Sequence, residues 1–401
     1  MDDSRHAADS PQRPPAVKRL ACLDTPLVTL AVTGVAYLAL VLARLATHGW
    51  DASFFVTAGE QLVDRERAAP ELSILPDSAG YDGQYYYRLA LDPWTSVQVE
   101  HGVRLDAPAY RQQRIGYPLL VWALAFGKHD WVPAVLIGVN WVALCVLGWL
   151  GGCFARDSGC HALGGLLISM FPGFELVLAR DLTEILATTF LLGGFWLLRA
   201  DRGRSGVLAF TGAVLTRETA AAGVVASALA EAASVWRRGA SSSRRALLLA
   251  VPLLVWLAWQ ELLFVRWGTW PAAEAAQNFA MPLVDLVRFL RVTAAFDTPL
   301  HRIWFLELLL VGVFVAAVIH ALPTSRAQPR EKLAWLLYLG LSTLYGDSIW
   351  VEDWTFLRAL SELWVIGAVV LLGSAARSRH LLLPAVLALW LVVLWRILYF
   401  A

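Results

Sequence analysis

Long apolar runs dominate this chain of 401 residues. A helix needs roughly 20 predominantly apolar residues to cross the hydrocarbon core of a bilayer. Hydrophobic residues make up 58% of the chain and charged residues 16%, which is more apolar surface than one soluble core can bury. We therefore expect an all-α polytopic membrane protein. Apolar runs suited to spanning lie at about 25–47, 131–154, 161–178, 184–200, 246–266, 301–322, 332–349, 358–375 and 380–400.

One further apolar region, 206–233, is too long for one upright span and too short for two full ones. As a single helix it would measure about 42 Å, at roughly 1.5 Å per residue. Arg217 and Glu218 interrupt it, and arginines flank both of its ends. Because positive charge favours the cytoplasmic side, both ends should lie there. We therefore expect a broken hairpin that turns at Arg217–Glu218, and counting it as two gives about 11 transmembrane passes.

The same count assigns each loop to one side of the membrane. The polar segment 1–24 becomes a cytoplasmic tail. A membrane module follows at 25–235 with a long outer loop at 48–130, and further transmembrane helices occupy 236–401. The acids near the membrane then gather on the outer side, so we expect an extracytoplasmic site. Within the outer loop, the apolar segment 115–127 is too short to span, which is typical of an interfacial helix.

Composition and motifs exclude several functional classes. The net charge is +1 without a polybasic run, which gives no electrostatic basis for nucleic-acid binding. The four cysteines have no metal-type spacing, and we expect neither a disulfide nor a metal site. The chain contains no Walker loop, dinucleotide fingerprint, nucleophile elbow or metalloprotease helix. We therefore expect no cofactor, and a lipid-linked substrate would have to supply the energy for chemistry on the outer face.

The polar stretch 79–120 holds the main candidates for that chemistry. Asp82 lies between Tyr81 and Gly83, and the residues after it can form a short helix that ends before Pro93. An aspartate in this position is often the N-cap of such a helix. Asp82 is equally a carboxylate placed to accept a proton from an incoming hydroxyl. The two roles are compatible, because a capping residue is held rigidly.

Aromatic and basic residues surround Asp82 in the sequence. The tyrosines either form an interfacial aromatic belt or stack on sugar rings. The arginines lie on the face where topology does not favour positive charge, so they either hold a phosphate or pair with acids of the loop. Together with one glutamine, the candidates for substrate binding are Tyr81, Gln84, Tyr85, Arg88, Arg111 and Arg114.

Two other segments place charges near the outer surface. Asp181 and Glu184 lie one turn apart at the end of an apolar run, a spacing that also fits a capping box. A charge at the membrane boundary is costly unless it is paired or functional. Arg217 and Glu218 either neutralise each other or contribute to substrate binding. A fourth group is expected to be mostly solvated loop charges: Asp347, Glu352, Asp353 and Arg358.

The order of these motifs resembles the GT-C superfamily of membrane glycosyltransferases, which use polyprenyl-phosphate-linked sugars. The likeness is to the branch of GPI-type and bacterial mannosyltransferases. YDGQYYYRLAL is similar to the first outer loop of that branch, and IGYPLLVWAL to the interfacial helix that follows. FPGFELVLARDLTE is similar to its acidic second loop, and LTRET to a basic break in a later helix. The resemblance covers roughly residues 25–235 and rests on order and spacing, because no single motif is specific.

This resemblance implies transfer of a sugar, such as a mannose-like hexose or a pentose, with inversion. Asp82 would take the proton of the acceptor hydroxyl, and Asp181 or Glu184 would match the acid of the second loop. Arginines would stabilise the departing phosphate. Asp51, in HGWDASFF, lies closer to the first apolar run, where the superfamily carboxylate usually lies, and is a second candidate for the base. The partners would be a polyprenyl-phosphate sugar and a cell-envelope glycan, lipid or protein acceptor.

Two other functional classes remain open. A transporter or flippase for a lipid-linked or amphipathic solute often has related halves, and here only a short similarity around Asp51 and Asp82 suggests repetition. A non-catalytic assembly factor would use the arginine and tyrosine cluster to dock a protein. The low lysine content beside abundant arginine is associated with GC-rich bacterial genomes. We therefore expect a bacterial cytoplasmic membrane protein, with its N-terminus inside and its site outside.

Overall fold

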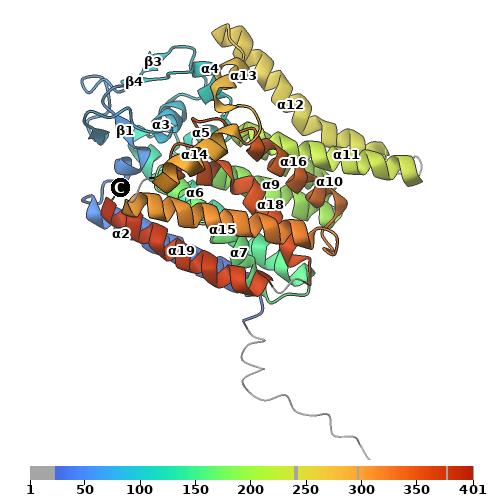
Figure 1. Cartoon of the computed structure of the whole chain (residues 1–401). Helices are drawn as coiled ribbons and strands as arrows, with labels where there is room; N and C mark the ends of the chain where they lie inside the picture. The colour runs from blue at the N-terminus through green and yellow to red at the C-terminus, as the bar shows by residue number, and fades with distance from the viewer. Residues whose placement is uncertain (1–22, 239–242, 296–297, 376–377, 401) are drawn as a thin grey trace, which may run out of the picture.

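The computed structural model describes residues 23–238, 243–295, 298–375 and 378–400. Helices dominate these residues, and the described strands form only two short two-stranded sheets (Figure 1). This confirms the expected all-α class. The predicted cytoplasmic tail, 1–24, lies almost entirely outside the described residues.

Six helices in the described part of the chain are long and apolar enough to cross a membrane. The count rises to seven if the helices α17 (Asp353–Ala359) and α18 (Ser361–Leu372), which meet at 47°, form one bent span. The structure thus supports a polytopic membrane protein but not the predicted count of about 11. The six spans are α2 (Pro26–Thr47), η2 with α6 (His129–Asp157), η4 with α11 (Glu218–Trp236), Ala246–Trp267 of α12, α15 (Pro299–Ala321) and Leu381–Tyr399 of α19.

The overcount arises from apolar runs that fold into shorter helices. The run 161–178 divides before Pro172, which cannot donate a backbone hydrogen bond to the preceding turn. It forms η3 (Ala162–Gly165), α7 (Leu166–Ser169) and α8 (Gly173–Leu178). Three other runs form helices below the roughly 20 residues that a span requires. These are α9 (Glu184–Arg199) with 16 residues, α10 (Gly203–Thr216) with 14 and α16 (Pro329–Thr343) with 15.

The predicted helix break in the region 206–233 is present. Arg217 has an extended backbone, with φ −155° and ψ 129°, between α10 and η4 (Glu218–Ala220). After η4 the chain continues as α11 (Ala221–Arg238). Only the second half of this broken helix belongs to the six candidate spans, so two membrane crossings here are not supported.

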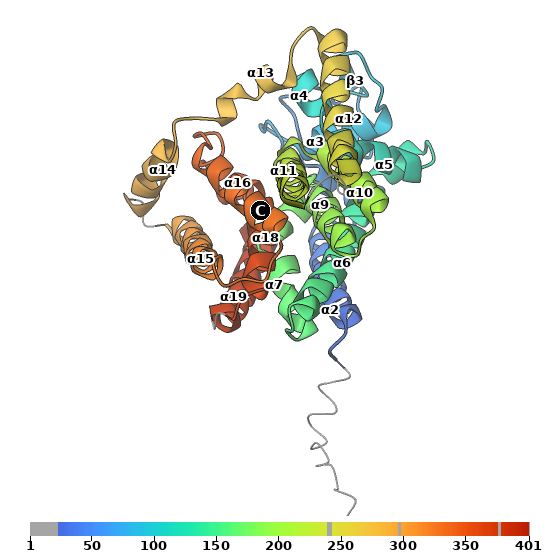
Figure 2. The same cartoon turned by 90° about the vertical axis from the view of Figure 1, so that its right-hand side faces the viewer.

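The helix α18 lies at the centre of the bundle, and all 12 of its residues are buried. It contacts α6 (Val132–Asp157) and α9 on one side, and α15 and α16 on the other (Figure 2). The indole of Trp364 in α18 donates a 2.8 Å hydrogen bond to the carbonyl of Leu167 in α7. The C-terminal helices therefore pack into the N-terminal module. The remaining helices are α12 (Ser243–Trp267), α13 (Pro271–Glu274), η6 (Ala276–Asn278), α14 (Val284–Ala295) and α19 (Ser378–Phe400).

The loop 48–130 folds into short elements at one end of the bundle (Figure 1). The strands β1 and β2 pair in parallel, while β3 and β4 pair antiparallel. The predicted interfacial helix is α5, which packs against α3 and α6. In chain order the elements are η1 (Ala52–Val56), β1 (Ala58–Gly59), β2 (Ile74–Leu75), α3 (Gly83–Leu91), β3 (Val99–Glu100), β4 (Val103–Arg104), α4 (Pro108–Gln112), α5 (Gly116–Leu124) and η2 (His129–Trp131).

Two close approaches at glycine join this loop to the bundle. A Cβ at Gly83, the first residue of α3, would lie 2.3 Å from the carbonyl oxygen of Arg180. A Cβ at Gly116, the first residue of α5, would lie 2.4 Å from the hydroxyl of Thr216 at the end of α10. Only glycine lacks a Cβ and allows these approaches. They place the start of α3 against Arg180, between α8 and α9, and the start of α5 against Thr216, directly before the helix break.

Candidate functional site

The carboxylate of Asp82 lies at the centre of a group of arginines from distant parts of the chain. Arg111 Nη1 donates to Oδ1 at 2.9 Å, and Arg358 Nη1 donates to Oδ2 at 2.7 Å. Arg114 Nη1 lies 4.0 Å from Oδ2. The Asp82 side chain keeps 13% of its surface exposed and makes no capping hydrogen bond. Its contacts are therefore those of an ion-pair centre rather than of a helix cap.

These ion pairs determine the protonation state of Asp82. Burial disfavours the charged carboxylate, but Arg111, Arg358 and Arg114 outweigh it and hold the pKa of Asp82 well below its usual range. The carboxylate is thus ionised at neutral pH. It is also a weak proton acceptor for as long as the guanidinium groups remain in place.

Arg111 joins Asp82 to a second carboxylate. It contacts both oxygens of Asp106, at 2.8 and 2.9 Å, and its guanidinium lies 4.1 Å from the ring centroid of Tyr85. Burial disfavours the charge of Arg111, yet Asp82 and Asp106 raise its pKa above the ordinary value. Arg111 is therefore a permanent cation between two acids. The predicted residue Tyr85 belongs to this part of the site.

Arg114 links the loop 48–130 to the helix break. It binds Glu218 in a bidentate ion pair, with contacts of 2.9 and 2.6 Å. It also donates to the hydroxyls of Tyr86 at 3.0 Å and Tyr110 at 2.7 Å. Burial raises the pKa of Tyr86 to about 12, although Arg114 opposes that shift. Tyr86 is thus a neutral hydroxyl in the wall of the site.

Arg217 and Glu184 extend the cluster into the bundle. Arg217 Nη1 lies 2.8 Å from Glu184 Oε1, and its Nε lies 3.4 Å from Glu362 Oε1. Arg358 Nη1 is 3.7 Å from the same oxygen of Glu184. The hydroxyl of Thr219 donates to Glu362 at 2.6 Å. We call the connected group of Asp82, Arg111, Arg114, Glu184, Arg217, Glu218, Arg358 and Glu362 the charged cluster.

Tyr81 forms one side of the charged cluster. Its hydroxyl lies 3.3 Å from that of Thr355, and its ring lies near two guanidinium groups. The distances to the ring centroid are 4.1 Å from Arg180 and 5.0 Å from Arg358. Arg180 also lies 3.5 Å from a ring centroid of Trp354. Aromatic faces attract such cations, so this wall concentrates positive charge beside Asp82.

Asp181 is adjacent to the charged cluster in sequence but is not an ion-pair member of it. Its backbone has a φ of 50°, and its side chain is fully buried. Among the described residues, neither carboxylate oxygen has a hydrogen-bond partner. A positive φ at a residue other than glycine is strained, and such strain gathers at functional sites. Of the two predicted acids in this loop, only Glu184 joins the charged cluster, through its contacts with Arg217 and Arg358.

Asp51 makes its contacts within the outer loop. It accepts hydrogen bonds from the backbone amide of Ser53 at 2.8 Å and from the hydroxyl of Ser53 at 3.0 Å. It also accepts one from the hydroxyl of Ser73. These contacts cap η1 and join it to the segment before β2. None of them connects Asp51 to the charged cluster.

Gln84 and Arg88 also bind their own loop. Gln84 accepts from the amide of Gly59 at 3.1 Å and donates to the carbonyl of Ala79 at 2.9 Å. Arg88 is fully buried and pairs with Glu100 at 2.8 Å. Both side chains hold the outer loop in shape around α3.

Four residues in or beside this site were not expected from the sequence to belong to it. Arg358 and Asp353 were expected to be mostly solvated loop charges, and that expectation is wrong for both. Asp353 is fully buried and pairs with Arg396, and the Arg358 side chain is 13% exposed. Arg358 and Glu362 are four residues apart, which is the spacing of neighbours on one face of a helix. This spacing is the one sequence signal that could have indicated that they act together. Arg180 and Glu362 were not singled out at all.

Comparison with protein-family models, curated proteins and solved structures finds no match to this chain. The functional conclusion therefore rests on the site itself. The arginines around the partly exposed Asp82 can bind an anionic group. The ionised carboxylate of Asp82 can accept a hydrogen bond from a hydroxyl beside that anion.

Proposed function

We propose that this protein is a membrane glycosyltransferase. It moves a sugar from a polyprenyl-phosphate donor to an acceptor hydroxyl with inversion, on the extracytoplasmic face. The observation that carries the proposal is the convergence of Arg111 and Arg358 on Asp82. Guanidinium groups bind phosphate as they bind carboxylate, so a cluster of this kind suits an anionic leaving group beside a carboxylate.

In the proposed step, the acceptor hydroxyl donates a hydrogen bond to Asp82 and its oxygen attacks the anomeric carbon. The bond between that carbon and the phosphate oxygen breaks, and its electron pair leaves with the phosphate. The hydroxyl proton passes to Asp82. Arg111 and Arg358 stabilise the charge that develops on the phosphate, as preorganised cations do for other leaving groups.

Donor binding also adjusts the basicity of Asp82. Without donor, Arg111 and Arg358 hold the pKa of the Asp82 carboxyl low. A bound phosphate takes over part of their positive charge, so the pKa of Asp82 rises and the carboxylate becomes a better base. Catalytic competence is thereby coupled to the presence of the donor.

The other site residues position these groups. Glu184 and Glu362 hold Arg217, and Glu184 also lies near Arg358, so the two glutamates orient the cations behind the phosphate. The rings of Tyr81 and Tyr85 offer apolar faces on which a sugar can stack. The proposal requires neither a metal nor a cofactor.

Transport of a lipid-linked solute is the second candidate, and one observation favours it. Glu175 in α8 and Glu307 in α15 are fully buried, and their carboxylate oxygens have no hydrogen-bond partner among the described residues. Unpaired acids inside a membrane protein often mark a proton or ion pathway. The charged cluster would then recognise the head group of the solute without chemistry.

A donor panel separates these candidates. Membranes that contain the protein are supplied with radiolabelled sugars on polyprenyl phosphates, and wild type is compared with Asp82→Asn and Asp51→Asn at matched expression. We expect transfer by wild type, loss with Asp82→Asn and retention with Asp51→Asn. Transfer that both variants leave unchanged would reject Asp82 as the base, and no transfer from any donor would reject the enzyme.

A further inference from the structure

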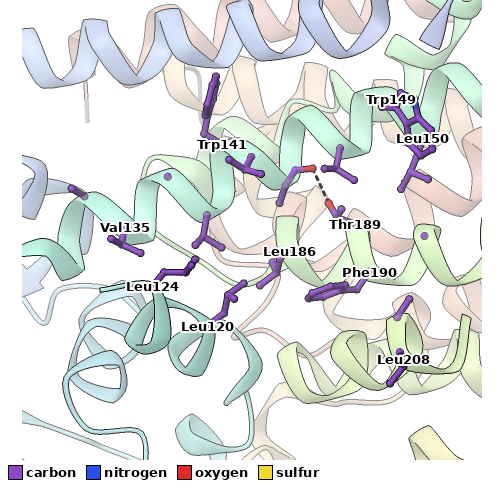
Figure 3. A pocket seen from close by; sticks show the side chains of 18 of the residues that line it. Leu120, Leu124, Val135, Trp141, Trp149, Leu150, Leu186, Thr189, Phe190 and Leu208 are labelled. Atoms are coloured by element: carbon purple, nitrogen blue, oxygen red, sulfur yellow. Dashed lines mark hydrogen bonds between the residues drawn. The ribbon is translucent and has the colours of Figure 1, made fainter. Parts of the chain in front are cut away.

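A long apolar groove lies between α5, α6, α9 and α10 (Figure 3). Its volume is about 1140 Å³. This is slightly larger than the roughly 300–1,000 Å³ of typical small-molecule pockets. Leu120, Leu186, Phe190 and Leu208 line it, and Figure 3 shows these side chains around the same space. The groove therefore offers a site for a hydrocarbon rather than for a polar ligand.

The hydroxyl of Thr189 in the lining supports this conclusion. Thr189 donates its hydroxyl to the carbonyls of Ile185 at 2.8 Å and Ala143 at 3.1 Å, so the hydroxyl is satisfied within the protein. Val142 and Leu208 in the lining are 53% and 74% exposed. These are apolar surfaces that only a lipid environment would cover favourably.

The length of the groove distinguishes between kinds of lipid. Along α6 and the turn before it, lining residues run from Asp130 to Leu150. At roughly 1.5 Å per residue this is about 30 Å. The hydrocarbon core of a bilayer is also about 30 Å thick, so the acyl chain of a phospholipid, confined to one leaflet, reaches only about half of it. A groove that spans the whole thickness fits a single chain longer than one leaflet.

Helices that line the groove lie close in sequence to members of the charged cluster. Leu186 of the groove lies two residues after Glu184, and Leu120 lies six residues after Arg114. The start of α5 also touches Thr216, the residue before Arg217. The segments around α5 and the start of α9 thus contribute both to the groove lining and to the charged cluster, and α10, which supplies Leu208, ends directly before Arg217. An amphiphile with a long apolar chain and an anionic head matches both features.

We infer that this groove binds the hydrocarbon chain of a polyisoprenyl phosphate, whose phosphate reaches the arginines of the charged cluster. The inference rests on the proposed function and names the site for the lipid portion of the donor. A chain held along α6 and α9 fixes the depth of the phosphate at the end of the bundle that carries the outer loop. The chain then contributes binding energy that positions the anomeric carbon beside Asp82.

Two glycines in the wall of the groove provide the test. A Cβ at Gly138 meets no atom within 4 Å, and a Cβ at Gly193 meets only the side chain of Leu150 at 3.9 Å. Gly138→Leu and Gly193→Leu therefore fill the groove without a clash at the Cβ. The control is Gly340→Leu in α16, where a Cβ also meets nothing within 4 Å and which is not part of the groove lining.

The experiment is photolabelling of the full-length protein in phospholipid nanodiscs. The probe is a polyisoprenyl phosphate of undecaprenyl length with a photoreactive group near the end of its chain, and it carries no sugar. We expect labelled peptides from α6 and α9. Gly138→Leu and Gly193→Leu should lower labelling by about fivefold or more, because leucine occupies the volume that the chain needs. Gly340→Leu should label as wild type does.

Competition identifies the ligand class. Unlabelled probe should compete, and farnesyl phosphate, whose chain is too short for the groove, should compete far less. Equal labelling by a photoreactive diacyl phospholipid, labelling outside α5, α6, α9 and α10, or equal labelling of the leucine variants would overturn the inference. Because the readout needs no sugar transfer, labelling of the groove without transfer from any donor would reject the proposed enzyme and leave this lipid site standing.

Discussion

Arg358 donates a 2.7 Å hydrogen bond to Asp82 across 276 positions of sequence. Arg358 belongs to α17, next to the buried central helix α18, and Asp82 directly precedes α3 in the outer loop. This contact makes the C-terminal helices part of the site, although the motifs that suggested a function all lie before residue 236. A variant that lacks Arg358 should therefore be as informative as one that lacks Asp82.

Replacing Arg358 with glutamine should impair both folding and transfer. The change removes one charged hydrogen bond from Asp82, which costs about 1.5–3 kcal/mol of stability for a pair of this kind. Transfer should fall by about tenfold or more, because one phosphate-stabilising cation is lost. Thermal unfolding in detergent and donor-panel kinetics measure the two effects. Arg358→Lys keeps the charge but not the planar guanidinium group, and it should retain more activity than Arg358→Gln.

The low pKa of Asp82 predicts a pH dependence of stability. The folded-state pKa lies below the ordinary value of 3.8, so the ionised carboxylate stabilises the native state. This stabilisation is complete at a pH above the ordinary pKa of Asp82. It declines as the pH falls from that value toward the lower pKa of the folded state. Wild type should therefore lose thermal stability in this acidic window more steeply than Asp82→Asn does. Parallel profiles for the two proteins would show that the arginines do not stabilise the charge of Asp82.

Asp51→Ala should affect stability rather than catalysis. The substitution removes the acceptor for Ser53 and Ser73 and should cost about 1 kcal/mol, as the loss of a helix cap usually does. Transfer per folded molecule should stay within about twofold, because Asp51 makes no contact with the charged cluster. The measurement is activity normalised to the folded fraction. Loss of transfer in a stably folded Asp51→Ala protein would return Asp51 to the role of base.

Gly83→Ala tests whether the position of Asp82 matters. A Cβ at this residue would lie 2.3 Å from the carbonyl oxygen of Arg180 and 2.7 Å from that of Val56, so the backbone must shift. We expect a loss of about 1–3 kcal/mol, typical of overpacking, and a larger fractional loss of transfer than of folded protein. Gly203→Ala is the matched control, because a Cβ there meets nothing within 4 Å.

Parts of this structure could be predicted from the sequence because their cause is local. A charged pair inside an apolar run predicted the helix break, and Arg217 does interrupt the backbone there. The outer loop was recognised from its polar stretch, which supplies Asp82. The structure does not support the predicted number of spans, because hydropathy does not separate a membrane-spanning helix from a short buried one. The apolar run that forms α9, for example, yields a helix of 16 residues, most of them buried within the protein.

The partners of the charged cluster could not be predicted, because they depend on tertiary packing. Nothing near Arg358 or Glu362 in the sequence indicates that α17 and α18 place them beside Asp82 and Arg217. Asp51 shows the reverse case. Its position after the first apolar run favoured a catalytic role, while its contacts are those of a cap. Spacing along the chain is thus a weaker guide to an ion-pair network than the folded contacts.

The most direct measurement is donor binding and transfer in the same preparation of Asp82→Asn. In the native protein, Asp82 competes with the donor phosphate for Arg111 and Arg358. Removing its charge should leave donor affinity equal or tighter, while transfer falls by about a hundredfold or more through loss of the base. Transfer within about twofold of wild type, or loss of donor binding in a folded Asp82→Asn protein, would contradict the account.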